Sequence, residues 1–461
     1  MFNRKVLWIT AIVLILNLSL GRNLAFVAND EETYQSLEIF SDALTKIKEN
    51  FVDPEKTHSR NLIYGAIKGM VEELDDPYTR FMTPEVYREM KVETKGEFGG
   101  LGIVITIKEG KLTVISPIEG TPAYRIGIKA GDIITHIEGE ETKDITLFEA
   151  VHKLRGPKGT KVTITVKREG EEDLLDFTII RDIIEIESVK YSTINKDIGY
   201  VRITTFNQNT HHELKEALSK LEKEEIKNLI IDLRNNPGGL LSSAVSVSDM
   251  FIKKGTIVST KGRIESQNRV YYAREEGTFP NYPLVVLINK GSASGSEIVA
   301  GAIKDLGRGV ILGERSFGKG SVQTVLSLPD ESGLVLSTAR YYTPNGTSIH
   351  EKGIDPHIIV EGPKFSEEEK KMLKKLEKGG YIKEFAKGHP NYTEDELDDF
   401  LTSLKEKEIK LDQTLIKSLI NKEIRRIKNE AEPVYELETD PQLKRAVDIL
   451  VAQKILSSRE R

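Results

Sequence analysis

Two uninterrupted apolar runs, each followed by a glycine-rich loop and a helix-like segment, are the strongest constraint on the fold of this 461-residue chain. The runs at Leu229–Ile231 and Leu284–Ile288 show no alternation of apolar and polar residues, which is typical of strands buried on both faces. From Glu185 to about Val360, strand-like runs alternate with helical segments, which predicts βα units and a mainly parallel sheet covered by helices. The strands are expected at 198–206, 227–234, 256–260, 283–289 and 309–313, and the helices at about 210–225, 240–252 and 296–306.

The segments on either side follow other patterns. Apolar residues recur at helical spacing from Glu31 to about Lys95, and a charge-rich helical stretch follows Pro363. Residues 98–182 instead show short runs with period-two alternation, which predict a β-rich domain. A further hairpin is expected around Asp330–Gly333. The predicted fold class is therefore a multidomain α/β protein with an inserted β-rich domain and helical ends.

The first residues indicate export from the cytoplasm. Arg4 and Lys5 precede an uncharged apolar run at 6–20, which is the arrangement of a secretory signal. The run is slightly short for a membrane span, although extension through 23–29 would allow an uncleaved anchor. We therefore expect residues 1–28 to be a signal peptide or a membrane anchor, and the body of the protein to lie in the periplasm or cell envelope.

The composition excludes several kinds of function. The 66 lysines and arginines are outnumbered by 72 aspartates and glutamates, so no basic face for nucleic acid is expected. The absence of cysteine excludes disulfides, thiolate catalysis and cysteine-based metal sites. No motif in the sequence requires a metal ion or an organic cofactor, and none is predicted.

The strongest catalytic signal is "NKGSASGSE" (289–297), where a buried strand passes into a helix. A serine at such a turn is exposed at the carboxyl end of the sheet, where ligands bind in open α/β folds. The backbone amides that follow lie at a helix N-terminus and can stabilise an oxyanion. The serines there suggest a nucleophile, with Ser296 predicted to cap the helix and Ser292 to line the loop. For "DLRNNPGG" (232–239), two interpretations fit: a tight turn, or a second source of oxyanion-stabilising amides.

A lysine between two glycines, in "SFGKGSVQ" (316–323), is the candidate base. A lysine accepts a proton only when neutral, and its ordinary pKa is about 10.4, so this role requires a pocket that disfavours the charge. The alternative is a phosphate-binding loop beginning at Gly313. Gly320 stands where that motif needs serine or threonine, and the residues after it are β-patterned rather than helical. A histidine base also stays open, because His350 and His357 lie nearest the predicted core.

Together these segments resemble the carboxyl-terminal processing peptidases, also called tail-specific proteases, over about residues 31–360. "GSASGSE", "FGKGSVQ" and "DLRNNPGG" are similar to the family's nucleophile, lysine and strand-loop segments, and "LDDPYTRFMTPE" and "YYTPNGTSIHEKGIDP" to two further signatures. The resemblance implies a ClpP/crotonase-like core in which Ser294 is the nucleophile, Lys319 the general base and Gln323 the residue that orients the base. It also implies oxyanion donors at the backbone amides of Gly239 and Gly295.

Two positions depart from the family pattern. Gly295 replaces the usual alanine, which keeps the amide but loosens the loop, and His357 stands where the family commonly has aspartate. Neither change affects the implied nucleophile or base.

Residues 98–182 resemble a PDZ domain. "GGLGI" (99–103) is similar to the carboxylate-binding loop of that module. The resemblance implies that Gly100, Leu101, Gly102 and Ile103 bind the C-terminus of a peptide. The implied organisation is a signal or anchor at 1–28, a helical region at 31–97, a PDZ domain at 98–182, a serine protease core at 183–362 and a helical region at 363–461.

The function implied by this resemblance is that of an exported serine endopeptidase. It would recognise protein substrates by their apolar C-terminal tails and cleave peptide bonds through an acyl-enzyme. The helical ends imply a homodimer or a higher homo-oligomer, and the N-terminal segment implies a membrane contact if it is not cleaved. The alternative is a PDZ scaffold whose protease domain is inactive.

Overall fold

The computed structural model describes residues 31–118, 120–428, 430 and 432–459, and the predicted signal or anchor at 1–28 lies outside these residues. The chain divides into two compact units. One comprises the residues up to Thr83 together with Val325–Leu336, and the other comprises Pro84–Thr324 together with the residues from Ser337 onward. In the part of the chain that is described, no helix is long and apolar enough to cross a membrane.

The smaller unit joins two segments that are distant in the sequence. Its elements are α2 (Glu31–Asn50), η1 (Pro54–Lys56), α3 (Ser59–Glu72), β1 (Arg80–Met82) and the adjoining ends of β17 (Ser321–Ser327) and β18 (Gly333–Tyr342). β1 pairs antiparallel with the first residues of β18. Tyr64 of α3 packs on Phe81 and donates its hydroxyl to Asp330 at 2.6 Å, in the turn between β17 and β18. The hairpin predicted at this turn is confirmed.

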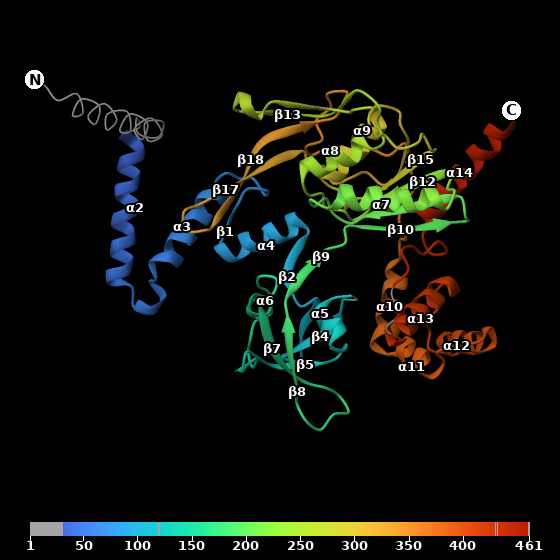
Figure 1. Cartoon of the computed structure of the whole chain (residues 1–461), viewed down its shortest axis with the longest axis horizontal. Coiled ribbons are helices and arrows are strands. Elements are labelled where there is room, and N and C mark those ends of the chain that lie inside the picture. Colours follow the sequence, from blue (N-terminus) through green and yellow to red (C-terminus); the bar gives the residue numbers. More distant parts are fainter. Residues whose placement is uncertain (1–30, 119, 429, 431, 460–461) are drawn as a thin grey trace, which may run out of the picture. The chain divides into compact units, whose positions relative to one another are not determined.

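The larger unit contains a six-stranded sheet, whose strands β10, β12 and β15 are labelled in Figure 1. Its strand order is β10-β11-β12-β15-β16-β19, and all neighbours are parallel except the edge pair β10–β11. The strands are β10 (Val189–Ile194), β11 (Ile198–Ile203), β12 (Asn228–Asp232), β15 (Leu284–Ile288), β16 (Val310–Gly313) and β19 (Ile358–Ile359). The predicted α/β fold class with a mainly parallel sheet is confirmed.

Helices cover both faces of this sheet. On one face, α7 (Thr210–Lys223), α8 (Leu241–Asp249) and α9 (Gly295–Asp305) pack against Leu229 and Ile231. On the other, α14 (Pro441–Arg459) packs against Ile230, which points the opposite way along the same strand. Every residue of β12 and β15 is buried, which explains why their apolar runs show no alternation.

One predicted strand belongs elsewhere. β13 (Thr256–Gly262) pairs antiparallel with β14 (Arg269–Tyr272) and with residues Ala339–Tyr342 of β18, in a second sheet. The expectation that the strand at 256–260 joins the βα series is therefore wrong. A local pattern of alternating strands and helices does not specify which partners a strand finds.

The β-rich segment has an antiparallel sheet and a core of its own. The sheet order is β3-β4-β5-β7-β8, with β6 paired to β5, and a separate core is formed mainly by residues such as Leu112, Ile134 and Val162. The elements are α4 (Pro84–Lys95), β2 (Glu97–Gly100), β3 (Ile103–Lys108), β4 (Lys111–Pro117), α5 (Pro122–Arg125), β5 (Ile133–Ile137), β6 (Glu140–Glu141), α6 (Leu147–Leu154), β7 (Lys161–Lys167), β8 (Leu175–Ile180) and β9 (Asp182–Glu185).

The C-terminal helices before α14 form another small core. They are α10 (Glu367–Lys378), α11 (Tyr381–Gly388), α12 (Glu394–Glu406) and α13 (Gln413–Lys428). Helices α10 and α12 each begin with a capping box, at Ser366 and Thr393. In both boxes a glutamate three residues later bonds back to the amide of the capping residue.

Candidate active site

The nucleophile turn, residues 289–294, connects β15 to α9. Ser294 has φ 53° and ψ −109°, a backbone conformation that non-glycine residues rarely adopt and that persists only where the surrounding structure holds it. Its carbonyl oxygen accepts the amides of Glu297 at 2.9 Å and Ile298 at 3.0 Å, so Ser294 is the N-cap of α9 through its backbone. The prediction that Ser296 caps this helix is wrong.

The two neighbouring serines connect the nucleophile turn to the strand-loop segment at 233–239. The Ser292 hydroxyl donates to the carbonyl of Leu233 at 2.8 Å, and the Ser296 hydroxyl donates to the carbonyl of Asn236 at 3.0 Å. The amide of Ala293 donates to the same Asn236 carbonyl at 3.0 Å. Both serines are fully buried, so their hydroxyls fix the position of one loop against the other.

The glycine pair of the strand-loop segment is required by close packing. Gly238 has φ 101°, and a Cβ there would lie 2.7 Å from the Cβ of Ser294 and 2.8 Å from the amide nitrogen of Gly295. Gly239 has φ 144°, and a Cβ there would collide with the carbonyl of Phe206. A side chain at Gly238 would therefore separate the loop from Ser294, and one at Gly239 would separate it from Phe206.

Two backbone amides beside Ser294 are available for a ligand. In the first turn of α9, the amides of Ser296, Glu297 and Ile298 donate to carbonyls of the turn, whereas no acceptor is recorded for the amide of Gly295 among the described residues. The same holds for the amide of Gly239. These are the two amides that the sequence resemblance assigns to an oxyanion hole, and such orphan donors at a helix N-terminus suit a developing negative charge.

Glu297 links the nucleophile turn to the lysine segment. Its Oε2 accepts the amide of Ser294 at 2.8 Å and the amide of Lys319 at 2.9 Å. Its Oε1 accepts the Ser316 hydroxyl at 2.6 Å and the Gly318 amide at 2.7 Å. The backbone amides of the candidate nucleophile and of the candidate base thus share one carboxylate oxygen as their acceptor.

The carboxyl of Glu297 is fully buried, and all four of its neighbours are donors. Burial raises the pKa of Glu297, while the bonds from Ser316, Gly318, Ser294 and Lys319 favour the charged form and limit that rise. Sequence reasoning did not single out Glu297. The spacing Ser-x-x-Glu was a signal for a capping role, but its bonds to the lysine segment could not be foreseen.

The glycines around Lys319 allow the segment at 349–353 to approach. A Cβ on Gly320 would collide with the amide of His350, and a Cβ on Gly318 would lie 3.2 Å from the backbone of Glu351 and Gly353. β17 begins at Ser321, directly after these glycines. A phosphate-binding loop needs a helix at this point, so that alternative is wrong.

Two further residues, Gln323 and Tyr341, lie on the strands that follow the lysine segment. The Gln323 amide donates to the hydroxyls of Ser321 at 2.8 Å and Ser337 at 3.1 Å, which fixes its orientation on β17. Tyr341, which sequence reasoning missed, is buried and donates its backbone amide to Gly320 at 2.7 Å. Burial raises the pKa of the Tyr341 hydroxyl, and a hydrogen bond with Ser294 opposes that rise. Tyr341 therefore contacts both halves of the site.

Neither candidate histidine has the surroundings of a triad base. The Nδ1 atom of His350, which a triad carboxylate would orient, is buried without a hydrogen-bond partner in the described structure. The Nδ1 of His357 accepts the amide of Ile311 at 3.0 Å, in a structural role at the start of β19. Burial and the nearby Lys304 lower the pKa of His357.

The predicted carboxylate-binding loop lines a groove in the β-rich segment. A cavity of about 70 Å³ lies between this loop and α6, and all four predicted residues line it, from Gly100 to Ile103. Gly102 has φ 76° and a Cβ there would collide with Thr121, so the loop depends on glycine. The cavity is lined by Phe98, Gly100, Leu101, Gly102, Ile103, Ile105, Val151, Leu154 and Arg155. Among residues 31–459 that are described, no cluster of three His, Asp or Glu side chains is placed to hold a metal ion.

Comparison with known proteins gives the class to which this fold and site belong. Residues 197–360 match peptidase family S41, residues 113–168 match a PDZ domain, and residues 22–86 match the N-terminal domain of the activating protease CtpB. The protein is a peptidase of family S41 that carries a PDZ domain.

Full-length relatives specify the family more narrowly. The carboxy-terminal-processing protease of Bartonella bacilliformis is 42% identical over 368 residues, which cover 79% of this chain and 84% of that protein. The carboxy-terminal processing protease CtpA of Bacillus subtilis is 38% identical over 324 residues, which cover 70% and 69% of the two chains. The chain belongs to the carboxy-terminal processing protease family. A solved photosystem II D1 C-terminal processing protease is 31% identical, with a TM-score of 0.41 over 70% of this chain and 92% of that chain.

Proposed function

We propose that this protease cleaves peptide bonds with a Ser294–Lys319 dyad and recognises its substrates by their C-termini through the PDZ domain. The observation that carries the proposal is the bridge formed by Glu297, which holds the backbone amides of Ser294 and Lys319 on one oxygen atom. This bridge brings the backbones of two segments 25 residues apart to one oxygen atom, which supports the proposal that their side chains exchange a proton.

The proposed reaction begins with proton transfer from the Ser294 hydroxyl to the neutral amine of Lys319. The serine oxygen attacks the scissile carbonyl, and the resulting oxyanion is stabilised by the amides of Gly239 and Gly295. Collapse of this intermediate breaks the C–N bond, and the lysine returns its proton to the leaving amine. Water then attacks the acyl-enzyme, with Lys319 taking the proton of the water and passing it back to Ser294. Gln323, whose amide is fixed by Ser321 and Ser337, is proposed to orient the base.

The PDZ groove is proposed to select the substrate. Its lining is apolar at Leu101, Ile103, Ile105 and Val151, which suits a small apolar side chain at the C-terminus. The terminal carboxylate would lie at the backbone amides of residues 100–103, and the tail would add to the sheet as a further strand.

Export and assembly are also part of the proposal. The basic residues and apolar run before residue 21 support an extracytoplasmic location, with membrane anchoring if the segment is retained. Helix α2 exposes Tyr34, Leu37, Phe40 and Ile47, and an apolar helix face of this kind supports a homodimer or a higher homo-oligomer. We also propose the domain boundaries expected from the sequence, with the PDZ domain at 98–182 and the protease core at 183–362.

The dyad is tested with three variants, assayed on an unfolded protein that ends in an apolar tail. Ser294→Ala and Lys319→Ala should each abolish cleavage, and Lys319→Arg should be equally inactive because arginine cannot become a neutral base. Lys290→Ala is the matched control, since it removes an exposed lysine from the nucleophile turn itself and should cleave normally. Full activity in any of the first three variants contradicts the dyad, and failure of Ser294 to react with a fluorophosphonate probe favours the inactive scaffold.

A further inference from the structure

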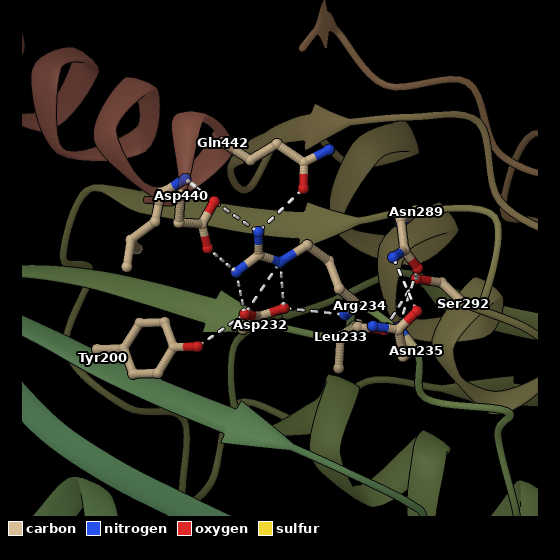
Figure 2. Close-up of polar contacts among 10 residues, drawn as sticks. Tyr200, Asp232, Leu233, Arg234, Asn235, Asn289, Ser292, Asp440 and Gln442 are labelled. Atoms are coloured by element: carbon tan, nitrogen blue, oxygen red, sulfur yellow. Dashed lines mark hydrogen bonds and ion pairs between the residues drawn. The ribbon is translucent and has the colours of Figure 1, made fainter. Parts of the chain in front are cut away.

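A buried ion-pair network lies at the carboxyl end of β12 (Figure 2). The Arg234 guanidinium bonds to both carboxylate oxygens of Asp232, with Nη2 at 2.6 Å and Nε at 2.9 Å and 3.0 Å. On its other edge, Nη1 donates to Asp440 at 2.8 Å and to Gln442 at 3.0 Å, and Nη2 lies 2.6 Å from the second oxygen of Asp440. The Tyr200 hydroxyl donates to Asp232 at 2.7 Å. The start of α14 thus completes the coordination of Arg234.

The partners of Arg234 come from two segments that are distant in the sequence, one at Asp232 and the other at Asp440–Gln442. Asp232 is fully buried and Gln442 is 2% exposed, so Arg234 has little access to water. Gln442 is itself held, because its amide donates to the carbonyl of Val360 at 2.8 Å. A guanidinium in such a place keeps a single orientation as long as both carboxylates are present, because removal of either leaves N–H donors of Arg234 buried without an acceptor.

The residues next to Arg234 contact the nucleophile turn. The carbonyl of Leu233 accepts the hydroxyl of Ser292, and the amide of Asn235 donates to the side chain of Asn289 at 2.9 Å. The Asn289 amide donates back to the Asn235 side chain at 3.0 Å (Figure 2). Both sequence neighbours of Arg234, Leu233 and Asn235, therefore contact the nucleophile turn. The loop that carries Gly238 and Gly239 follows directly after them.

We propose that the C-terminal segment Asp440–Gln442 is a positioning element of the active site. By fixing Arg234, it sets the strand-loop segment so that the Gly239 amide lies where the oxyanion develops. Asp440 is a positioning residue in this scheme, because it acts through Arg234 and does not touch the substrate. The inference rests on the proposed oxyanion role of Gly239. It extends the catalytic apparatus to a residue 206 positions beyond Arg234.

Asp440 also has a local structural role, which the test must separate from its ion pair with Arg234. We call that ion pair the clamp. Its side chain accepts the amide of Leu443 at 2.9 Å, so Asp440 is the N-cap of α14. Serine is an equally good N-cap residue but is too short to bridge to Arg234. Asp440→Ser therefore keeps the cap and removes the clamp, and Asp440→Asn keeps the cap and the length while losing the charge.

The experiment measures kcat and KM for cleavage of a peptide with an apolar tail by the full chain. Asp440→Ser should lower kcat about 10- to 100-fold with KM within about twofold of the wild type, since a misplaced oxyanion donor weakens only the transition state. Asp440→Asn should recover part of the loss. Lys454→Ala is the matched control, because it removes another ion pair between α14 and the core, to Asp197 at 2.6 Å, and should leave kcat unchanged.

Each outcome bears on one hypothesis. If the wild type does not cleave, the proposed function fails before the clamp is tested. If the wild type cleaves and a folded Asp440→Ser variant matches it in kcat, the clamp is overturned. If Asp440→Ser does not fold, Asp440→Asn decides in its place. A kcat loss of equal size in Lys454→Ala also overturns the proposal, because the effect would then reflect general loosening of α14.

Discussion

Replacement of Glu297 by glutamine should disable the site while changing a single atom of the side chain. The carboxylate accepts four hydrogen bonds, two on each oxygen. Glutamine keeps one oxygen, and its NH2 group would face the other pair of donors. Hydrogen bonds to a charged group contribute roughly 1.5–3 kcal/mol each, so loss of two costs on the order of 3–6 kcal/mol.

This loss should appear in two measurements. The free energy of unfolding in urea should fall by about 3 kcal/mol or more, because two buried donors are left without an acceptor. Acylation of Ser294 by a fluorophosphonate probe should slow by at least about 100-fold, since the turn and the lysine segment are no longer held together. Glu396→Gln is the matched control. It makes the same change at the same position of an exposed capping box, and should alter neither quantity.

The pH dependence gives a second test of the same bridge. Burial raises the pKa of Glu297, so its proton is bound at a pH above the usual range of glutamate. The folded state then binds this proton more readily than the unfolded state, and a protonated carboxyl, unlike a glutamine amide, keeps an acceptor lone pair on each oxygen. Uptake of the proton therefore does not destabilise the fold. The rate of Ser294 acylation should therefore decrease at acidic pH while the chain stays folded. Wild-type acylation and stability in Glu297→Gln would refute the bridge.

Two further predictions concern other parts of the core. Gly238→Ala should abolish cleavage, because its Cβ would lie 2.7 Å from that of Ser294; Gly346→Ala, at φ 77° with open space around it, carries backbone strain alone and should remain active. The pKa of His357 is lowered in the folded state, so its contribution to stability is complete above about pH 6.5 and is lost as the pH falls below that value. Urea unfolding at pH 7.5 and 5.5 should show this loss, and His357→Asn, which can still accept the Ile311 amide, should reduce it. An unchanged pH difference in that variant contradicts the assignment.

Much of the fold could be read from local patterns. Uninterrupted apolar runs predicted β12 and β15 because strands covered on both faces have no polar side to expose. Period-two alternation predicted the antiparallel sheet of the β-rich segment, and helical spacing predicted α7, α8 and α9. The family followed from short motifs whose residue types are dictated by chemistry and by close backbone approach, such as Gly238 beside Ser294.

Long-range contacts were beyond such reasoning. The sequence by itself determined which segments are strands and helices, and which residue types could do the chemistry. Only the tertiary structure decided that β13 joins the second sheet, that Ser294 rather than Ser296 caps α9, that Glu297 bridges two motifs, and that Asp440 coordinates Arg234. The periodicity of apolar residues indicates which face of a segment is buried, because each residue is selected for its own degree of burial. A hydrogen bond depends on the position and direction of two groups at once, and those are defined only when distant segments have packed together.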